Sequence, residues 1–367
     1  MVSIGSFVNQ KLLSAYRNAT ANLHDLRYIF FELTHRCNLS CLHCGSDCVR
    51  ETNVPDLPAD DVLRVLREIK LKYNPHEISV VLSGGEPVCY PGVFDLGRKI
   101  VDMEFPWGMV TNGYAWTKDA ISAAKTSRMH SITVSLDGLA PEHNWLRGRS
   151  NSFERAVNTI KMLVDDPFYQ AMDVVTCINK RNLGAIDETY QLIKDLGVKQ
   201  WRLFTISPIG RALDHSELFL DAGEFRHLLG KIADYRTRNE IGVTYSESGY
   251  LGTEVEKGVR DQCSFCQAGI SVAGVMLNGD ILACPNIDRR FGQGNIGRDS
   301  FIDVWENGFA VFRDRSWMKT GQCRECSEWS LCRGNSFHLW DIENKKTRVC
   351  HYKLLNEAPR SVNRTAQ

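Results

Sequence analysis

The sequence has 367 residues, 43% of them hydrophobic, which is enough for one large domain and a smaller one. Lys plus Arg number 44 and Asp plus Glu number 44, so the formal net charge is zero. A balanced charge argues against a nucleic-acid-binding face. No apolar run has membrane-spanning length, and the first ten residues lack the pattern of a secretory signal. We therefore expect a cytoplasmic protein that binds neither nucleic acid nor membrane.

Short apolar runs alternate with stretches of helical period after a helical lead-in over residues 1–25. Strands are predicted at 27–33, 77–82, 107–111, 131–136, 173–178 and 201–206, with helices at 58–71, 92–103, 117–127, 152–164 and 186–196. This alternation predicts an α/β fold, a partial (β/α)6 TIM-like barrel over 26–215. Active sites of such barrels lie at the C-terminal ends of the strands.

The alternation breaks after residue 206. One more helix is predicted at 222–238, within a bridging helical region over 216–260. Residues 261–355 are loop-rich and cysteine-rich, with a hairpin (272–276 and 281–284) around Asn278-Gly279 and a short helix at 301–307. Little regular structure is predicted over 321–350, where metal ligation would substitute for a core. Residues 356–367 are predicted to be a tail.

The cysteines, 13 in number, are bunched. Disulfides are rare in a reducing compartment, so metal or cluster ligation is their expected use. The groups are Cys37, Cys41, Cys44 and Cys48, then Cys263, Cys266 and Cys284, then Cys323, Cys326, Cys332 and Cys350. Cys89 and Cys177 stand alone, and free cysteines often pack as small hydrophobes. Cys89, close after Pro87, is the candidate for a catalytic side chain.

Cys37, Cys41 and Cys44 follow the first predicted strand, with three and then two residues between them. A cubic 4Fe–4S cluster has four irons, so three thiolates leave one iron open to another ligand. That is a catalytic arrangement, as an open position is for zinc. Cys48 as a fourth ligand would close the site, and zinc is the alternative metal.

This spacing, with the motifs that follow it in order, resembles the radical S-adenosylmethionine (SAM) superfamily over residues 26–206. The motifs are Ser83-Gly84-Gly85-Glu86-Pro87, Thr111-Asn112-Gly113, Ser135-Leu136-Asp137-Gly138, His143 and Arg147-Gly148. The resemblance implies that an external donor of flavodoxin or ferredoxin type reduces the cluster. SAM is then cleaved to methionine and a 5′-deoxyadenosyl radical, which abstracts hydrogen from the substrate.

The resemblance also implies a set of SAM contacts. Gly84 and Gly85 would let backbone approach SAM closely. Glu86 would accept hydrogen bonds from its amine, while Ser135 and Arg147 would bind its carboxylate or ribose. The remaining members of the set are the His43 backbone at the adenine, Asn112 at the ribose, and Ile178 and Leu203, which either flank the adenine or belong to the core.

The C-terminal cysteines resemble the SPASM subgroup, in which such cysteines hold auxiliary clusters. By resemblance, Cys323, Cys326, Cys332 and Cys350 enclose one 4Fe–4S cluster, and Cys263, Cys266 and Cys284 hold another, which makes three clusters in all. Ser336 stands where the pattern expects a fourth cysteine for the second of these. Its fourth iron is therefore open, binds substrate, or takes Ser336, His338 or water. A smaller or absent cluster and a zinc ribbon are the alternatives.

The substrate implied by the resemblance is a ribosomally made peptide or protein, which would be oxidised or crosslinked while the auxiliary clusters accept an electron or bind substrate. Only 26 residues precede the first predicted strand, too few for a leader-binding domain. A separate leader-binding protein or the barrel rim would then recognise the leader. The second hypothesis is a small molecule such as a sugar, cofactor precursor or tetrapyrrole. The third is a non-catalytic zinc-binding interaction module.

Overall fold

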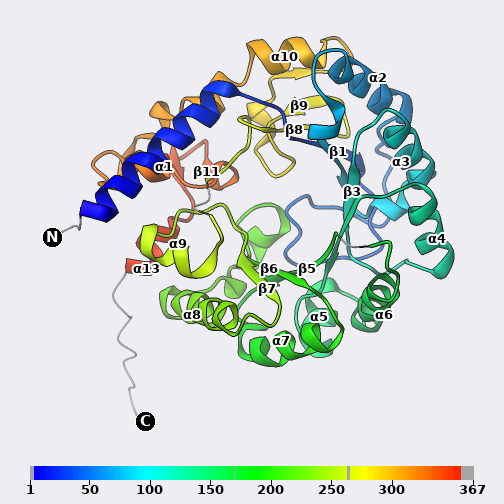
Figure 1. Ribbon diagram of the computed structural model, residues 1–367, viewed down its shortest axis with the longest axis horizontal. Helices are drawn as coiled ribbons and strands as arrows, with labels where there is room; N and C mark the ends of the chain where they lie inside the picture. The colour runs from blue at the N-terminus through cyan, green and yellow to red at the C-terminus, as the bar shows by residue number, and fades with distance from the viewer. Residues whose placement is uncertain (1–3, 170, 263–264, 357–367) are drawn as a thin grey trace.

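The computed structural model describes residues 4–169, 171–262 and 265–356, so the predicted tail lies almost wholly outside it. A ten-stranded sheet has the order β10-β9-β8-β1-β2-β3-β4-β5-β6-β7 and curves into a partial barrel (Figure 1). The strands that pair in parallel from β1 to β7 are β1 (Tyr28–Thr34), β2 (Ser79–Gly84), β3 (Trp107–Thr111), β4 (Ser131–Ser135), β5 (Met172–Ile178), β6 (Gln200–Thr205) and β7 (Gly242–Tyr245).

The helices that follow these strands lie outside the sheet (Figure 1). They are α2 (Ala59–Lys70), α3 (Val93–Asp102), α4 (Lys118–Thr126), α5 (Ala140–Arg147), α6 (Ser152–Val164), α7 (Ile186–Asp195), α8 (Ala222–Arg238) and α9 (Thr253–Val259). The predicted α/β barrel is confirmed. The structure adds β7 and α5, which the sequence pattern did not indicate because β7 has four residues and α5 only eight.

The α8 boundary shows why some elements are readable from sequence. Asp221 accepts a hydrogen bond from the Glu224 amide at 2.9 Å, and the Glu224 side chain accepts one from the Asp221 amide at 2.8 Å. This reciprocal capping box satisfies two backbone donors that a helix start leaves free. The helix accordingly begins at Ala222, where it was predicted.

The predicted hairpin extends the barrel sheet. Its first strand, β8 (Val272–Val275), pairs in parallel with β1, and β9 (Asp280–Leu282) returns antiparallel to it. Short elements follow in the C-terminal segment: β10 (Gly294–Asn295), α10 (Phe301–Asn307), α11 (Ala310–Arg313), α12 (Trp329–Cys332), β11 (Trp340–Asp341), β12 (Lys346–Thr347) and α13 (His351–Asn356).

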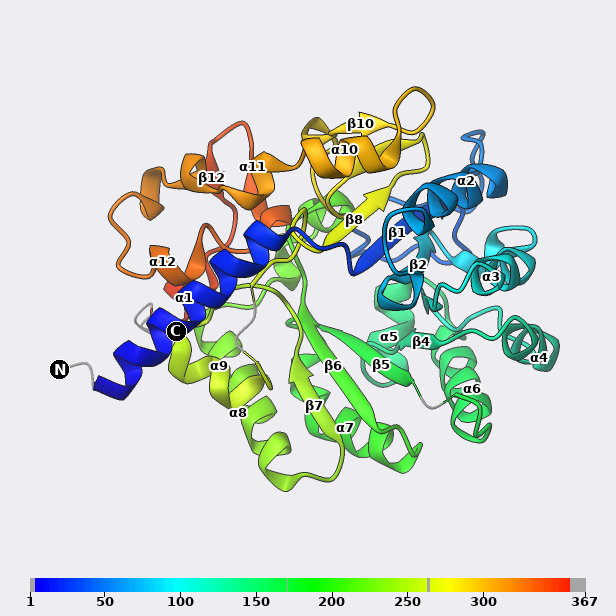
Figure 2. The same ribbon diagram turned by 45° about the horizontal axis from the view of Figure 1, so that its top comes forward.

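The N-terminal helix α1 (Ile4–Leu23) packs along this C-terminal segment (Figure 2). Arg17 donates to the carbonyl of Leu331 at 2.6 Å, and the His24 ring stacks on Trp305 with centroids 3.9 Å apart. Both ends of the chain therefore stabilise the same side of the barrel. Among the described residues, no helix is both long and apolar enough to cross a membrane.

Two helical glycines should respond oppositely to alanine. A Cβ on Gly97 in α3 would lie 2.2 Å from the ring of buried Trp107, whereas Gly230 in α8 has open space. We expect Gly97→Ala to destabilise the protein by roughly 1–3 kcal/mol, the usual cost of overpacking. Gly230→Ala should stabilise it by about 0.5–1 kcal/mol. Thermal unfolding of the two variants checks this; equal melting temperatures would contradict it.

Candidate active site

A cavity of about 680 Å³ opens at the C-terminal ends of the parallel strands. Barrel residues form one wall, and residues of the C-terminal segment form the opposite wall. The residues predicted from sequence that line it are Cys37, Cys41, His43, Cys44, Gly84, Gly85, Glu86, Asn112, Ser135, Arg147, Cys266 and Cys284. The motifs read separately along the chain therefore meet around one space.

The first three cysteines lie on the loop of residues 35–49 that follows β1, called here the cysteine loop. Its base is closed by the Cys37 amide, which donates to the Val49 carbonyl at 2.7 Å. Its middle is held by the C-terminal end of α5, because the amides of Ser40 and Leu42 donate to the carbonyls of Arg147 and Leu146 at 3.2 and 2.9 Å. Backbone hydrogen bonds thus set where the thiols stand.

Arg211 holds the other end of the cysteine loop. Its guanidinium donates to the carbonyls of Cys41 and Cys48 at 2.9 and 2.6 Å, and its amide donates to the Cys44 carbonyl at 3.0 Å. Sequence reasoning did not find Arg211, because it lies beyond the sixth strand in a stretch without a recognisable motif.

Glycines pack against the cysteine loop from three directions. A Cβ at Gly85 would lie 2.1 Å from the Arg36 carbonyl oxygen, one at Gly148 would lie 2.9 Å from that of Ser40, and one at Gly210 would lie 2.6 Å from that of Cys44. These contacts give a second reason for glycine at 85, beside its expected approach to SAM. At Gly84 the end of β1 fills the space instead, since a Cβ there would lie 2.4 Å from the Thr34 carbonyl oxygen.

The three thiols carry the features of a cluster site. Asn112 Nδ2 lies 3.7 Å from Cys37 Sγ, and an Arg147 guanidinium nitrogen lies 3.8 Å from Cys41 Sγ, so two of the three sulfurs have a side-chain hydrogen-bond donor from the barrel. Burial raises the pKa of Cys37 to about 12 and also raises that of Cys41. Iron would displace these thiol protons. The donor set fits a cluster bound by three thiolates.

Cys48, the alternative fourth ligand, lies against Cys44. A hydrogen bond from the Cys48 thiol lowers the pKa of Cys44 to about 5, and the same interaction raises the pKa of Cys48. The Cys48 thiol also lies 3.7 Å from the Ser46 carbonyl. Both cysteines line the cavity, so a substitution of Cys48 tests whether its thiol is a fourth ligand.

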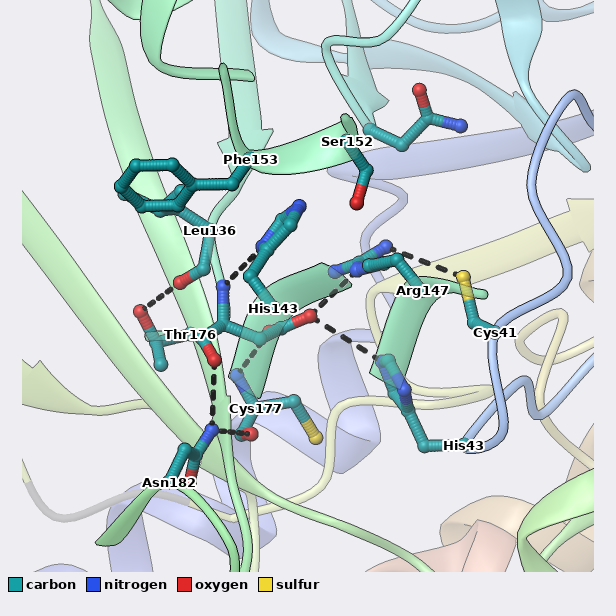
Figure 3. Close-up of polar contacts among 12 residues, drawn as sticks. Cys41, His43, Leu136, His143, Arg147, Ser152, Phe153, Thr176, Cys177 and Asn182 are labelled. Carbon is teal, nitrogen blue, oxygen red and sulfur yellow. Dashed lines mark hydrogen bonds and ion pairs between the residues drawn. The ribbon is translucent and has the colours of Figure 1, made fainter. Parts of the chain in front are cut away.

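Asp137 is buried and belongs to a network of polar contacts with Arg147 and Cys177; Figure 3 shows these two residues with Cys41. Its carboxylate accepts hydrogen bonds from Arg147 Nε at 2.6 Å and from the Cys177 amide at 2.8 Å. Burial alone would raise its pKa, but Arg147, His43 and His143 lower the pKa to about 2. The expected role of Arg147 toward SAM is therefore joined by a second one, because its guanidinium bridges a carboxylate and a cluster thiol.

Two histidines beside Asp137 are neutral and each has an unpaired ring nitrogen. Burial lowers the pKa of His43 to about 4 and that of His143 to about 3. Among the described residues, His43 Nδ1 and His143 Nε2 are buried without a hydrogen-bond partner. His43 lines the cavity, whereas its Nδ1 atom is buried.

Glu86 is held by the end of β3. Its carboxylate accepts hydrogen bonds from Thr111 Oγ1 at 2.6 Å and from the Asn112 amide at 2.8 Å. Burial raises its pKa to about 7, although these two donors act in the opposite direction. The Gly-Gly-Glu-Pro and Thr-Asn-Gly motifs are thus joined to each other before any ligand binds.

Three predicted site residues lie away from the cavity. Ile178 and Leu203 are fully buried in the hydrophobic core, and their neighbours Cys177 and Phe204 line the cavity instead. Side chains alternate along a strand, so a shift of one residue reverses the face. Cys89, the catalytic candidate, does not line the cavity either, and its pKa is raised by burial.

The C-terminal cysteines form two sets in space. Cys266 and Cys284 line the cavity, and the Phe337 amide donates to Cys266 Sγ at 3.4 Å. Cys263, predicted to join them, lies outside the described residues. Away from the cavity, burial raises the pKa values of Cys323, Cys332 and Cys350; the charge of Cys350 adds to the first two shifts and that of Cys326 adds to the third.

Comparisons with known proteins agree with this arrangement. The sequence profile of the radical SAM superfamily matches residues 31–193, and that of the SPASM iron-sulfur cluster-binding domain matches residues 266–327. This chain is a radical SAM enzyme with a SPASM domain. The radical SAM domain implies SAM and a 4Fe–4S cluster, and the SPASM domain implies auxiliary iron–sulfur clusters.

The relatives of this radical SAM enzyme include heme synthases and mycofactocin maturases, as their names describe them. It is 27% identical to an AdoMet-dependent heme synthase of Methanosarcina barkeri, over 84% of this chain and 90% of that protein. It is also 27% identical to the mycofactocin maturase MftC of Mycobacterium tuberculosis, over 83% and 76%. Streptococcus suis SuiB bound to S-adenosylmethionine shares the fold, with a TM-score of 0.69 and 19% identity over 90% of this chain and 80% of SuiB.

Gly85→Ala should loosen the cysteine loop of this radical SAM enzyme. The added Cβ would overlap the Arg36 carbonyl and force the backbone before Cys37 to move. We expect reconstituted iron per chain to fall, together with SAM cleavage. Gly184→Ala, where no atom lies within 4 Å of the added Cβ, is the matched control and should match wild type. Full iron content in Gly85→Ala would contradict the idea that close packing at Gly85 holds the cysteine loop in its iron-binding shape.

Asp137→Asn should destabilise the iron-free protein by about 3–5 kcal/mol, because it leaves the buried Arg147 guanidinium without its carboxylate. The Asp137 pKa is lowered on folding, so its stabilising effect is present above pH 3.8 and is lost as the pH falls toward 2. The melting temperatures of wild type and variant should therefore converge in acid.

The control for that measurement is Asp61→Asn. Asp61 pairs with Arg64 on the surface, where both side chains are more than one-third exposed. Such pairs contribute roughly 0–1 kcal/mol. A melting temperature for Asp137→Asn as high as that of Asp61→Asn at neutral pH would contradict the proposed importance of the buried pair.

Proposed function

We propose that this enzyme abstracts hydrogen from a side chain of a ribosomally made peptide or protein, giving an oxidised or crosslinked product. When bound, SAM and the Cys37/Cys41/Cys44 cluster would supply a 5′-deoxyadenosyl radical after one-electron reduction. The observation that carries the proposal is the single cavity lined by these cysteines on one side and by Cys266 and Cys284 on the other. The auxiliary clusters would be placed to take an electron from the substrate or to bind it.

The residues of the barrel wall would hold SAM. Arg147, fixed by Asp137, offers donors for its carboxylate, and Ser135 offers a donor for its carboxylate or ribose; all three of Arg147, Ser135 and His43 line the cavity. Asn112 stands at the end of β3 beside Cys37. Cys177 and Phe204 replace Ile178 and Leu203 as the side chains proposed to face the bound cofactor.

The size of the cavity favours a peptide side chain as the reacting group. Pockets of roughly 300–1,000 Å³ hold one drug-sized ligand. Here the space of about 680 Å³ would be shared by SAM, the cluster groups and the substrate. A side chain that enters from the rim needs little of that volume. The resemblance to a mycofactocin maturase supports the same substrate class.

A tetrapyrrole is the second candidate substrate. The observation that favours it is the similarity to the heme synthase, which extends over most of both chains. A macrocycle would have to lie across the rim of the cavity rather than inside it. Anaerobic incubation with each substrate class and mass spectrometry of the products separates the two candidates. A mass change confined to the tetrapyrrole would overturn the peptide proposal.

Further parts of the proposal concern partners and cofactor number. An external donor of flavodoxin or ferredoxin type would reduce the cluster, and a separate leader-binding protein or the barrel rim would recognise a leader. The cysteine sets support three 4Fe–4S clusters, or about 12 irons per chain. Stoichiometric zinc with no SAM cleavage would favour the interaction-module alternative.

Cysteine substitutions give different expected outcomes at the two ends of the chain. Cys41→Ala should abolish SAM cleavage under dithionite, because the catalytic cluster loses a ligand. Cys326→Ala should spare much uncoupled cleavage and impair product formation. Cys89→Ser, outside the cavity, is the control and should behave as wild type. Cleavage of SAM by Cys41→Ala would refute the proposed cluster site.

Cys48→Ala decides whether the cluster of the cysteine loop is open. If three thiolates bind it, this variant keeps its iron and still cleaves SAM. If Cys48 is a fourth ligand, wild type has no open iron for SAM. The Cys48→Ala variant would then gain an open iron, and its SAM cleavage would rise above that of wild type. The second result would contradict the three-thiolate assignment.

A further inference from the structure

A buried carboxylate lines the cavity without an ion pair to lysine or arginine. Glu247 follows β7, its side chain is 6% exposed, and it lines the cavity with Cys266 and Cys284. Among the described residues, no Lys or Arg forms an ion pair with the carboxylate; His338 Nε2 lies 3.5 Å from Oε1, and the Arg260 guanidinium donates to the main-chain carbonyl of Glu247. Buried carboxylates are costly unless they are paired or bind a metal. Glu247 has only a histidine as a side-chain partner of opposite charge, and only when that histidine is protonated.

Ser336 connects Glu247 to the position of the missing cysteine. Ser336 is fully buried, and its hydroxyl donates to Glu247 Oε1 at 3.0 Å. A cysteine at 336 would be the fourth ligand that the SPASM pattern expects. The serine hydroxyl instead donates a hydrogen bond to the neighbouring carboxylate, so the carboxylate lies beside the place of that ligand.

The backbone around Ser336 is fixed against Cys266. Arg315, which is 1% exposed, donates to the carbonyls of Asn335 and Cys266, each at 3.1 Å. The next amide after Ser336, that of Phe337, donates to Cys266 Sγ at 3.4 Å. Ser336 is therefore held next to a cysteine of the cavity by contacts on both of its sides, and Glu247 is held there through Ser336.

One carboxylate oxygen of Glu247 remains available. The contacts with Ser336 and His338 both go to Oε1, and no described residue donates to Oε2. Glu247, Cys266 and Cys284 line the same cavity. An outer pair of donors that orients a ligating carboxylate is the usual arrangement at metal sites.

We propose that Glu247 supplies an oxygen ligand to the iron–sulfur cluster held by Cys266 and Cys284, in the place of the cysteine absent at position 336. The inference rests on the auxiliary cluster of the proposed function. Ser336 and His338 orient the carboxylate through Oε1, and Oε2 binds iron. The cluster thus has one oxygen ligand, which a substrate group could displace more readily than a thiolate.

The test compares full-length wild type with Glu247→Gln, Glu247→Cys and the control Glu240→Gln, all reconstituted anaerobically with iron and sulfide. Glu240 pairs with Tyr190 and Lys194 away from the cavity. SAM is added to cap the open iron of the Cys37/Cys41/Cys44 cluster. Iron per chain and the EPR signal of 3Fe–4S clusters are measured after mild oxidation, since a cube that lacks a ligand loses one iron.

We expect the 3Fe–4S signal to rise about tenfold or more in Glu247→Gln, since even the loss of an outer hydrogen-bond partner costs about 10–100-fold in metal affinity. Glu247→Cys should return it to the wild-type level by restoring a thiolate. A wild-type signal and iron content in Glu247→Gln would overturn the proposal and would show that the carboxylate binds substrate or nothing.

A variant that takes up no auxiliary iron is also informative. If Glu247→Gln lacks the cluster altogether, recovery in Glu247→Cys supports ligation, and continued absence overturns it. SAM cleavage by wild type under dithionite is measured separately. Failure of that cleavage counts against the proposed function, whereas the iron and EPR comparison decides the ligand of the auxiliary cluster independently of turnover.

Discussion

The position of three thiols depends on a backbone cradle. A cluster-binding loop has few apolar contacts of its own, so its shape must be imposed by neighbours. Here the end of β2, the end of α5 and the turn at Gly210 each place a glycine against the loop, and Arg211 ties its carbonyls together. Residues of the barrel motifs thus hold the cysteine loop in place, in addition to their expected contacts with the cofactor.

The charged side chains beside the cysteine loop are also held in place by their neighbours. Arg147 is buried between Asp137 and Cys41, and the two histidines around Asp137 stay neutral because burial outweighs their attraction to the carboxylate. The site therefore keeps the fixed cation of Arg147 beside the Cys41 thiol. Such a preorganised charge would favour an anionic cofactor group without reorganising when it binds.

Much of this arrangement could be predicted from sequence because the strands and their motifs are local signals. Six strands, α8 and the hairpin lie where their apolar periodicity or turn chemistry placed them. Tertiary contacts were not readable: Arg211 has no motif, and the role of Gly85 depends on Arg36, far away in the chain. For Ile178 and Leu203 the sequence left two alternatives, adenine contact or core, and the structure places both in the core, because a single-residue shift along a strand reverses the face.

The pairing of β8 with β1 has a consequence for redox chemistry. The cysteine loop leaves the end of β1, and Cys284 follows the hairpin that β8 begins. Adjacent strands lie about 4.8 Å apart, a spacing fixed by their hydrogen bonds. If clusters bind at the cysteine loop and at Cys284, the paired backbones of β1, β8 and β9 would fix the distance between them. Insertions in the surface loops would then leave that distance unchanged.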